Sequence, residues 1–412
     1  MAAKQAAGTA LEGVRVLDIS NFLAAPLCSM FLADFGAEVI KIERPGQGDE
    51  MRFWGNNRDG VGLYYKVVNR GKQSVTADLR TPLGAEIVRR LAAESDVIVE
   101  NYRTGKLESW GLGPEVLHAI NPALVIVRVT GFGQSGPYRG RPGFGTLAEA
   151  YAGYAQISGE ADGPPMLPGF GLADATTGLM AAYLASVALH EARRSGKGQV
   201  VDLAIYETLL TLLGPQVVNF DQLGLVQRRE GSRLPFTAPR NTYRTRDGHW
   251  MAMAGSAQSA FERICRALGN PALTQDPRFA TNRARLTHHR ELDVALQEAI
   301  GRFDLAELQE RFLAHDAPMA PVNDVAQILE DPQVVARDNI VSLPDEELGG
   351  RLRMQNVVGK LSRTPGRIRN TGPRLGEHNR AVLVDRLGID PARLAAAGID
   401  VAAPAMLDAA HD

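Results

Sequence analysis

The feature that most constrains the fold is a repeated alternation of short apolar runs with segments of helical period. Val14–Ile19 reads as a strand, Ala25–Phe35 as a helix with an apolar face, and Glu38–Glu43 as a second strand. A strand, a helix and a strand in this order make a right-handed crossover between two parallel strands. The N-terminal part of the chain therefore predicts an open parallel sheet with helices on its faces, which is the α/β class.

The same alternation continues to about residue 213. It predicts further strands at 96–99, 124–129 and 199–203, and further helices at 83–93, 114–119, 175–192 and 206–213. Residues 224–239 then form a polar stretch punctuated by Pro and Gly, which is typical of a linker. Because 412 residues exceed what one compact core organises, we expect two domains, or one large domain with an insertion.

A smaller α+β module follows the linker. A hairpin is predicted from residues 241–246 and 249–254, which are joined by Asp247-Gly248. Helices are predicted at 259–268, 290–300 and 305–315, and the C-terminal segment carries a short strand at 351–354 and a helix at 381–387.

Composition excludes several classes of function. The chain has 45 basic and 47 acidic residues without a long run of either sign, so we expect no binding to nucleic acid or to an anionic membrane. We find no signal-peptide core and no segment approaching the ~20 apolar residues of a membrane span, and we expect a soluble, cytoplasmic protein. Cys28 and Cys265 lack partners at metal-ligand spacing, and the eight histidines are scattered, so we predict two buried cysteines and no metal site.

Asp174 stands where a glycine-containing loop meets a long apolar helix. A carboxylate there is predicted to cap the helix and to face its positive end, which favours the ionised form. This placement makes Asp174 a candidate nucleophile. An ordinary capping aspartate has the same local sequence, so the motif alone leaves both interpretations open.

The glycines of Gly131–Gly136 follow a strand and match the spacing of a dinucleotide-binding loop. That motif needs a helix that opens on its last glycine, whereas Pro137–Gly143 extends the loop. We therefore interpret the loop as a flexible segment whose backbone N–H groups cradle an anion or an oxyanion, and we assign Gly133 and Gln134 to it as catalytic candidates.

Basic residues gather after the second strand and in the loop that follows. They are Lys41, Arg44, Arg52, Arg70, Lys72 and Arg80, and Asn101-Tyr102-Arg103 closes a third strand at the same predicted edge. Ligands of open α/β sheets bind beyond the carboxyl ends of the strands, so the pattern favours a phosphorylated ligand. Solvated surface charge and a simple Asn turn are the alternatives.

Taken in order, these segments resemble the family III CoA transferases, which include formyl-CoA transferase, carnitine CoA-transferase and α-methylacyl-CoA racemase. The matching stretches are residues 11–18, 35–46, 99–103, 121–124, 131–138 and 376–378. The resemblance implies a Rossmann-like large domain built from both chain ends, an inserted small domain and an interlocked homodimer. On this basis we place the large domain at 1–222, the small domain at 225–325, and a segment returning to the large domain at 330–412.

The resemblance also implies the roles of individual residues. Asp174 is the nucleophile, which forms an aspartyl anhydride and then an aspartyl-CoA thioester, and the 131–136 loop lies beside the thioester. The residues assigned to CoA binding and to the adjoining pocket are Arg44, Lys72, Arg80, Asn101, Arg103, Phe22 and Leu23. CoA thioesters are substrates, and no permanently bound cofactor is expected.

Two departures from the family narrow the reaction. Phe144 stands where the racemases carry a histidine base, which removes half of an acid/base pair. Leu23 stands where the formyl-CoA enzyme has a glutamine. We therefore predict transfer of CoA to a free acid, with a small dicarboxylate such as succinate as the preferred type, and Arg141 and Arg240 as cations for its second carboxylate. A 2-methylacyl-CoA racemase or epimerase, and a CoA-binding protein without turnover, remain the alternatives.

Overall fold

The computed structural model describes residues 8–401, which divide into two compact units. The first unit contains residues 8–152, 168–213 and 335–401, and the second contains 153–167 and 214–334. The sequence placed the breaks near 222–225 and 325–330 and kept 153–167 in the large domain. Residues 153–167 group with the second unit because the Gly231 N–H donates to the Gly159 carbonyl at 2.9 Å and Arg229 donates to the Gln156 carbonyl.

A six-stranded, all-parallel sheet organises the first unit, in the order β5-β2-β1-β6-β7-β8. The strands are β1 (Arg15–Asp18), β2 (Glu38–Glu43), β5 (Lys72–Thr76), β6 (Val97–Glu100), β7 (Val125–Thr130) and β8 (Val200–Ala204). All but β5 were predicted within a residue or two. Strand β5 has polar residues at four of its five positions, so it lacks the apolar run by which the others were found.

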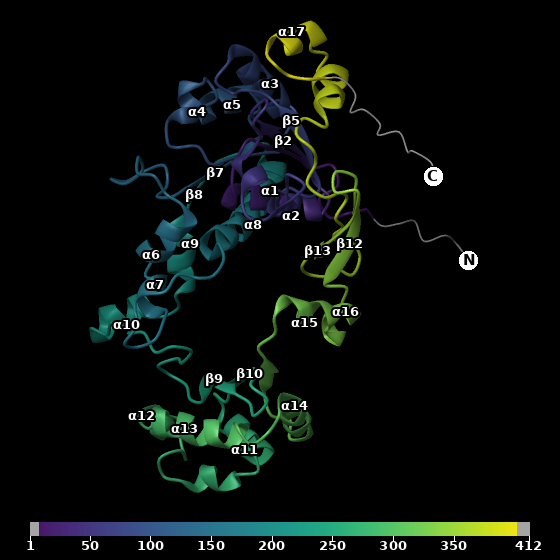
Figure 1. The fold of residues 1–412 in the computed structure, drawn as a ribbon. Helices are drawn as coiled ribbons and strands as arrows, with labels where there is room; N and C mark the ends of the chain where they lie inside the picture. Colours follow the sequence, from purple (N-terminus) through teal and green to yellow (C-terminus); the bar gives the residue numbers. More distant parts are fainter. Residues whose placement is uncertain (1–7, 402–412) are drawn as a thin grey trace, which may run out of the picture. The chain divides into compact units, whose positions relative to one another are not determined.

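Helices and short elements complete the first unit (Figure 1). They are α1 (Ala24–Asp34), the 3-10 turn η1 (Glu50–Phe53), the short strands β3 (Asn57–Arg58) and β4 (Val61–Gly62), α2 (Leu63–Val68), α3 (Pro82–Ala92), α4 (Lys106–Ser109), α5 (Pro114–Ile120), α6 (Gly145–Tyr151), α8 (Leu172–Ser195), α9 (Ile205–Leu212), the hairpin β12 (Ile340–Asp345) and β13 (Gly350–Gln355), the π-helix η3 (Arg380–Arg386) and α17 (Pro391–Ala396).

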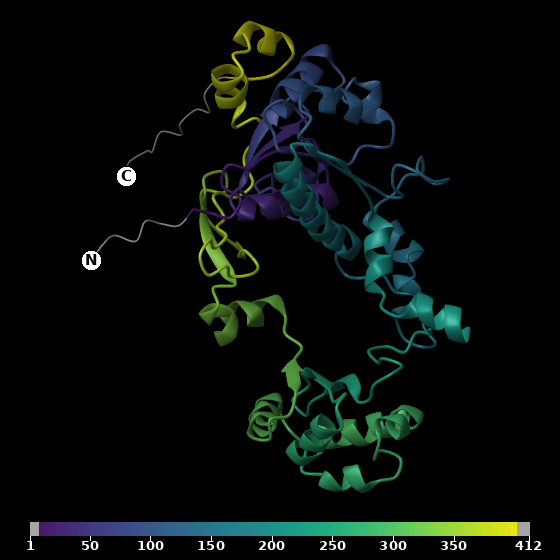
Figure 2. The same cartoon turned by 180° about the vertical axis from the view of Figure 1, so that it is seen from behind.

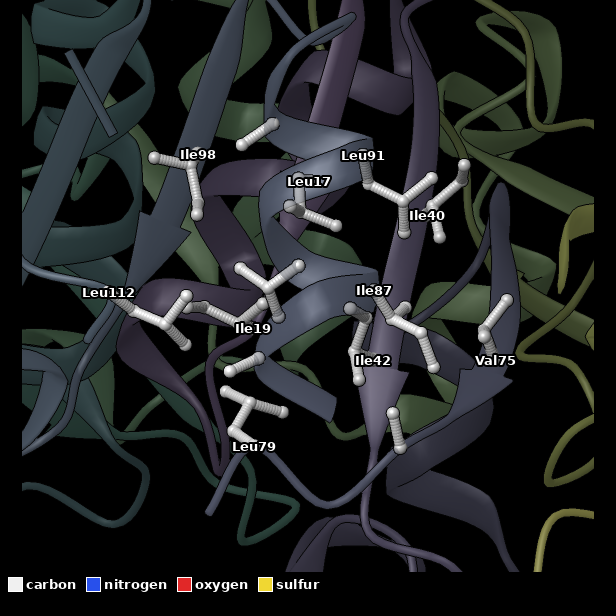
Figure 3. Packing of buried hydrophobic residues seen from close by; sticks show 14 of the residues in the cluster. Leu17, Ile19, Ile40, Ile42, Val75, Leu79, Ile87, Leu91, Ile98 and Leu112 are labelled. Carbon is white, nitrogen blue, oxygen red and sulfur yellow. The ribbon is translucent and has the colours of Figure 1, made fainter. Parts of the chain in front are cut away.

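Helix α3 shows how one face of the sheet is covered. Its Ile87 and Leu91 are fully buried and face Leu17, Ile40 and Ile42 of the sheet (Figure 3). Thr81 caps the helix by accepting from the Gly84 N–H at 3.1 Å. Burial of this apolar face, at roughly 25 cal/mol per Å², is the main stabilisation of the layer.

Helix α8 lies against α1, and a glycine sets the closeness of the contact. A Cβ added at Gly178 would lie 2.6 Å from the Leu27 Cβ and 2.9 Å from the Ala24 carbonyl oxygen, so only glycine fits. The sequence predicted no segment suited to a membrane span, yet α8 meets that test by length and composition. A single such helix is weak support for a span, because core helices of soluble proteins have the same properties.

The C-terminal segment packs onto the edge of this sheet. The His378 N–H donates to the Ser74 carbonyl at 2.9 Å, and the Asn379 side chain accepts from the Thr76 N–H at 2.7 Å. The β12–β13 hairpin lies beside α2, which is visible from behind in Figure 2, and Asp345 pairs with Lys66 at 3.0 Å.

The second unit has its own apolar core around Met251, Phe261 and Phe312. A three-stranded antiparallel sheet, in the order β11-β10-β9, is covered by helices. The elements are α7 (Tyr154–Ile157), α10 (Gln216–Leu223), β9 (Arg240–Arg244), β10 (Trp250–Ala254), α11 (Gln258–Ala267), the 3-10 turn η2 (Pro271–Gln275), α12 (Asn282–Thr287), α13 (His289–Ile300), α14 (Leu305–Ala314), β11 (Met319–Pro321) and α15 (Val325–Glu330), and α16 (Pro332–Ala336) spans the boundary.

Candidate active site

The candidate site lies where the strand order of the sheet reverses. From β1 the chain proceeds outward to β2 and β5 on one side, and from β6 to β7 and β8 on the other. The loops after β1 and β6 are joined, because the Asn101 side chain accepts from the Asn21 N–H at 2.9 Å and donates to the Asn21 carbonyl at 2.7 Å. Such a switch point is the usual ligand crevice of open α/β sheets. Asn101 therefore shapes the floor of the crevice.

Asp174 lies in the first turn of α8, but it is not the N-cap. The helix begins at Leu172, and its N-cap is Gly171, which has no side chain to cap it. The Asp174 carboxylate instead accepts a hydrogen bond from the backbone N–H of Gly145, at the start of α6. A Cβ at Gly145 would lie 2.4 Å from the Asp174 Oδ2, so glycine is required for this approach.

The pKa of Asp174 is shifted in the direction opposite to the prediction. Burial and the charge of Glu149 raise the pKa of Asp174 to about 6, and the Gly145 hydrogen bond offsets only part of this. The predicted stabilisation of the anion by the helix end is outweighed, because the site is apolar and a second carboxylate shares the helix terminus. At neutral pH the carboxylate is still mostly ionised, and its basicity is higher than that of an exposed aspartate.

Two neighbours of Asp174 were not found from the sequence. Glu149 of α6 is buried and accepts from the Ala173 N–H at 3.1 Å, so it takes the capping role that was assigned to Asp174. Tyr64 of α2 lies near Asp174. The pKa of Tyr64 is raised, mainly by its burial and in addition by the negative charge of Asp174. The sequence did offer one sign of this role for Glu149. It stands four residues after Gly145, so both residues lie on the same face of helix α6.

The walls beside Asp174 are apolar and aromatic. The Phe22 ring lies edge to face with Trp54 at 5.9 Å and with Phe144 at 6.0 Å between centroids. Leu23 is buried and approaches the α8 terminus, because its Cδ2 lies 2.9 Å from the point where a Cβ of Gly171 would be. Phe22 and Leu23 therefore lie on the Asp174 side of the crevice, where they form an apolar wall.

The predicted basic residues at the strand ends line two pockets. Arg44, Arg80 and Arg103 line a pocket of about 250 Å³. Arg44 and Arg80 also line a larger one of about 630 Å³. Arg44 donates to the Gln47 side chain at 2.7 Å, and Arg80 pairs with Asp78 at 2.7 Å. Both guanidinium groups lie at the surface and can exchange these local partners for the phosphates of a ligand.

Lys72 does not belong to this group. It was predicted in the loop that follows the second strand, but it lies on β5 and is fully buried. Its Nζ donates to Asp18 at 2.8 Å, to the Pro26 carbonyl and to Asn69. Burial lowers the pKa of Lys72 to about 8 in spite of the Asp18 charge. The assignment of Lys72 to CoA binding is therefore corrected to a structural role beneath the crevice.

The glycine loop is held differently from the prediction. The Gln134 N–H donates to both Asp202 carboxylate oxygens at 3.0 Å, so this donor does not face a ligand. Gly133 has a φ of +82°, as the turn requires. The two ends of the loop come into close backbone contact at Gly131 and Gly143, since a Cβ on either residue would lie 2.4 Å from the Cα of the other. No helix opens on Gly136, which confirms that the loop is not the dinucleotide-binding motif.

The remaining predicted groups are placed as follows. Cys28 and Cys265 are both buried, as predicted. Arg141 stacks on Tyr138 at 3.6 Å in the first unit, whereas Arg240 belongs to the second unit and donates to the Ser232 carbonyl. Within residues 8–401, no group of three or more His, Cys, Asp or Glu side chains is arranged to hold a metal ion.

Comparison with known proteins defines the class. Residues 11–379 match CoA-transferase family III. The chain is 45% identical over 380 residues to succinyl-CoA–D-citramalate CoA-transferase of Chloroflexus aurantiacus, covering 92% of this chain and 94% of that one. It is 36% identical over 382 residues to succinate–glutarate CoA-transferase of Agrobacterium fabrum, covering 91% and 95%. A CAIB/BAIF family protein from Brucella suis has a TM-score of 0.82 and 34% identity, covering 92% and 99%.

The chain therefore belongs to CoA-transferase family III. It is a transferase that moves CoA from an acyl-CoA thioester to a free carboxylic acid. The resemblance drawn from the sequence is confirmed, and the six-stranded parallel sheet agrees with the expected α/β class.

Proposed function

We propose that this protein transfers CoA from succinyl-CoA to a C4 or C5 dicarboxylic acid, through covalent intermediates on Asp174. The observation that carries the proposal is the Asp174 carboxylate itself, held by the Gly145 N–H beside an apolar wall at the switch point of the sheet. The relatives are named for succinyl-CoA or succinate together with citramalate, malate or glutarate, which supports the choice of donor and acceptor.

The proposed reaction begins with attack of the Asp174 carboxylate on the thioester carbonyl. The bond from that carbonyl to sulfur breaks, CoA leaves as a thiolate, and a mixed anhydride of Asp174 and succinate forms. The thiolate then attacks the aspartyl carbonyl, which gives an aspartyl-CoA thioester and free succinate. The acceptor carboxylate repeats these steps in reverse order, which restores Asp174 and releases the new acyl-CoA.

The surroundings of Asp174 fit each requirement of this chemistry. The raised pKa, about 6, leaves an ionised and relatively basic nucleophile at neutral pH. The Gly145 N–H can stabilise charge on the aspartyl oxygen, and the buried Leu23 side chain and the Phe22 ring limit access of water to the anhydride from one side. Arg44, Arg80 and Arg103 would hold the phosphates of CoA.

The test is chemical trapping of the intermediate. Succinyl-CoA is incubated with the protein and then with hydroxylamine or borohydride, and the modified peptide is identified by mass spectrometry. We expect modification at Asp174 and none in Asp174→Ala. Incubation of 2-methylacyl-CoA in deuterated water distinguishes the racemase: α-deuteration without acid-dependent CoA exchange would contradict the proposal.

We also propose that the protein acts as an interlocked homodimer in the cytoplasm, with no permanently bound cofactor. Leu179, Tyr183 and Val187 form an exposed apolar stripe on α8, at intervals of four residues. Helix α10 has no buried residue, although it carries Val217, Val218 and Phe220. Such faces indicate a protein partner.

The mass in solution, measured by light scattering, should be twice that of the chain. The malate relatives are named as alpha and beta subunits, so a monomer that dimerises only with a second, different chain is the contrary outcome.

A further inference from the structure

Phe22 has an unusual backbone conformation for a bulky residue. Among residues 8–401, four non-glycine residues have positive φ, and the other three are Asp59, Asp316 and Asp338. Aspartate tolerates the left-handed region because its short side chain bonds locally, whereas a phenylalanine there is strained. Strain of this kind persists only where the surroundings impose it, and it is concentrated at functional sites.

A buried carboxylate imposes this conformation. Asp49 is completely buried, and its Oδ1 accepts from the Phe22 N–H and from the Met51 N–H, each at 2.9 Å. Its Oδ2 pairs with Lys41 at 2.9 Å, and the same Lys41 Nζ donates to the Ser20 carbonyl at 2.7 Å. Lys41 and Asp49 thus hold the loop after β1 from two sides.

The side chain of Phe22 is directed toward Trp54 and Phe144 as a result. Its ring packs edge to face between Trp54 and Phe144, and Phe144 immediately precedes the Gly145 that donates to Asp174. The next residue, Leu23, reaches the start of α8. A change in the backbone at Phe22 would therefore move two side chains that line the Asp174 side of the crevice.

We propose that Asp49 is a positioning residue that holds Phe22 in its left-handed conformation, and that Phe22 thereby determines which acyl groups the site accepts. The inference rests on the proposed function, because it takes Asp174 as the group beside which the acyl chain lies. The ligand class is the acyl portion of a short-chain dicarboxylic CoA thioester. Asp49 acts through Phe22 and does not contact the substrate.

A double-mutant cycle tests the inference on the full-length protein. The variants are Phe22→Gly, Asp49→Asn and the double variant, and the readout is the ratio of kcat/KM for succinyl-CoA to that for glutaryl-CoA, with kcat and KM determined separately. These donors differ by one methylene, so a change in the wall should alter the ratio by about 10-fold. We expect both single variants to change it.

Non-additivity is the decisive result. Glycine adopts positive φ without help, so Asp49→Asn should change the ratio less than about 2-fold once Phe22→Gly is present. An equal effect of Asp49→Asn in both backgrounds would show that Asp49 supports the fold in general, and it would overturn the inference. An unchanged ratio in Phe22→Gly would overturn it as well.

A stability measurement keeps the inference testable if Asp49→Asn does not fold. Phe22→Gly should melt no lower than Phe22→Ala, because both variants lose the ring contacts and only glycine relieves the strained φ. Asp59→Gly is the matched control: it relieves a left-handed residue that is exposed, and it should leave the donor ratio unchanged. A lower melting temperature in Phe22→Gly than in Phe22→Ala contradicts the inference, because the left-handed conformation would then cost phenylalanine nothing.

Failure of the covalent mechanism is distinguishable from failure of this inference. If Asp174→Ala retains turnover, the mechanism is wrong, yet the donor ratio still reports how the wall selects the acyl group. If an Asp174 adduct is trapped but the cycle is additive, only the positioning role of Asp49 is wrong.

Discussion

Two aspartates of the first unit have opposite surroundings. Asp18, at the end of β1, is fully buried and pairs with Lys72 at 2.8 Å and Lys41 at 4.0 Å. Burial opposes its ionisation, but the two lysines hold the pKa of Asp18 below its ordinary value. Asp174 has no Lys or Arg in an ion pair among residues 8–401, and its pKa is raised.

The difference shows that the buried lysines stabilise the fold, whereas the candidate nucleophile is kept apart from them. The deepest cations are paired within the sheet, where they join the loops after β1 and β2 and cannot reach a ligand. The candidate nucleophile is left without such a cation, so that its negative charge is available to a thioester. A carboxylate neutralised by lysine would be a weaker nucleophile.

The largest effect is expected at Asp174. Asp174→Ala should lower kcat by about 10³ to 10⁴-fold, because it removes the proposed nucleophile. CoA binding, measured by calorimetry, should change less than about 3-fold, since the nucleotide is held elsewhere. Substantial turnover in this variant would show that Asp174, like Asp18, is not the nucleophile.

Asp18→Asn should lower stability rather than catalysis. Loss of this carboxylate leaves Lys72 and Lys41 buried without their shared partner, which should cost about 3 to 5 kcal/mol in the free energy of unfolding. Urea denaturation followed by circular dichroism measures this. A variant that is as stable as the wild type but inactive would contradict this prediction, because Asp18 would then take part in catalysis.

The pH dependence of the free energy of unfolding should show that ionisation of Asp174 destabilises the folded protein. Its pKa is about 6 in the folded chain and 3.8 ordinarily, so the folded state holds the proton more tightly. Stability therefore falls as the pH rises from about 4 to about 6, and the penalty is complete above 6. Asp174→Asn should be more stable than the wild type by about 1 to 2 kcal/mol at pH 8, and by much less at pH 4.

Arg44→Ala tests whether the surface arginines, unlike the buried lysines, bind the substrate. KM for succinyl-CoA should rise about 10-fold, or about 1.4 kcal/mol, while kcat changes little, because a remote phosphate contact contributes uniform binding. Arg58→Ala, at an exposed guanidinium outside these pockets, is the control. If KM is the same in both variants, Arg44 is only surface charge.

The smallest effect is expected at Glu149. Glu149→Gln removes the neighbouring negative charge, so the pKa of Asp174 should fall and the acid limb of the kcat/KM profile should move to lower pH. Glutamine can still accept from the Ala173 N–H, which preserves the helix terminus. A profile unchanged in position would show that burial alone raises the pKa.

Much of the framework could be predicted from local patterns. Five of the six sheet strands have apolar runs that are readable one segment at a time. The helices α1, α3 and α8 coincide with predicted ones, although only α3 has a clear apolar stripe. Strand β5 escaped because its alternate residues, Lys72 and Ser74, belong to buried ion-pair and hydrogen-bond networks. Polar residues satisfied by distant partners do not reveal their burial in sequence.

The sequence by itself determined the family, the parallel sheet, the candidate nucleophile and the surface arginines, because these depend on motifs and on periodicity within short segments. The tertiary structure alone decided that Lys72 is internal, that Glu149 takes the capping role at α8, and that the pKa of Asp174 is raised. It also decided that Asp49 holds Phe22 in its left-handed conformation. Burial and charge pairing depend on residues that lie far apart in the chain, so no local pattern encodes them.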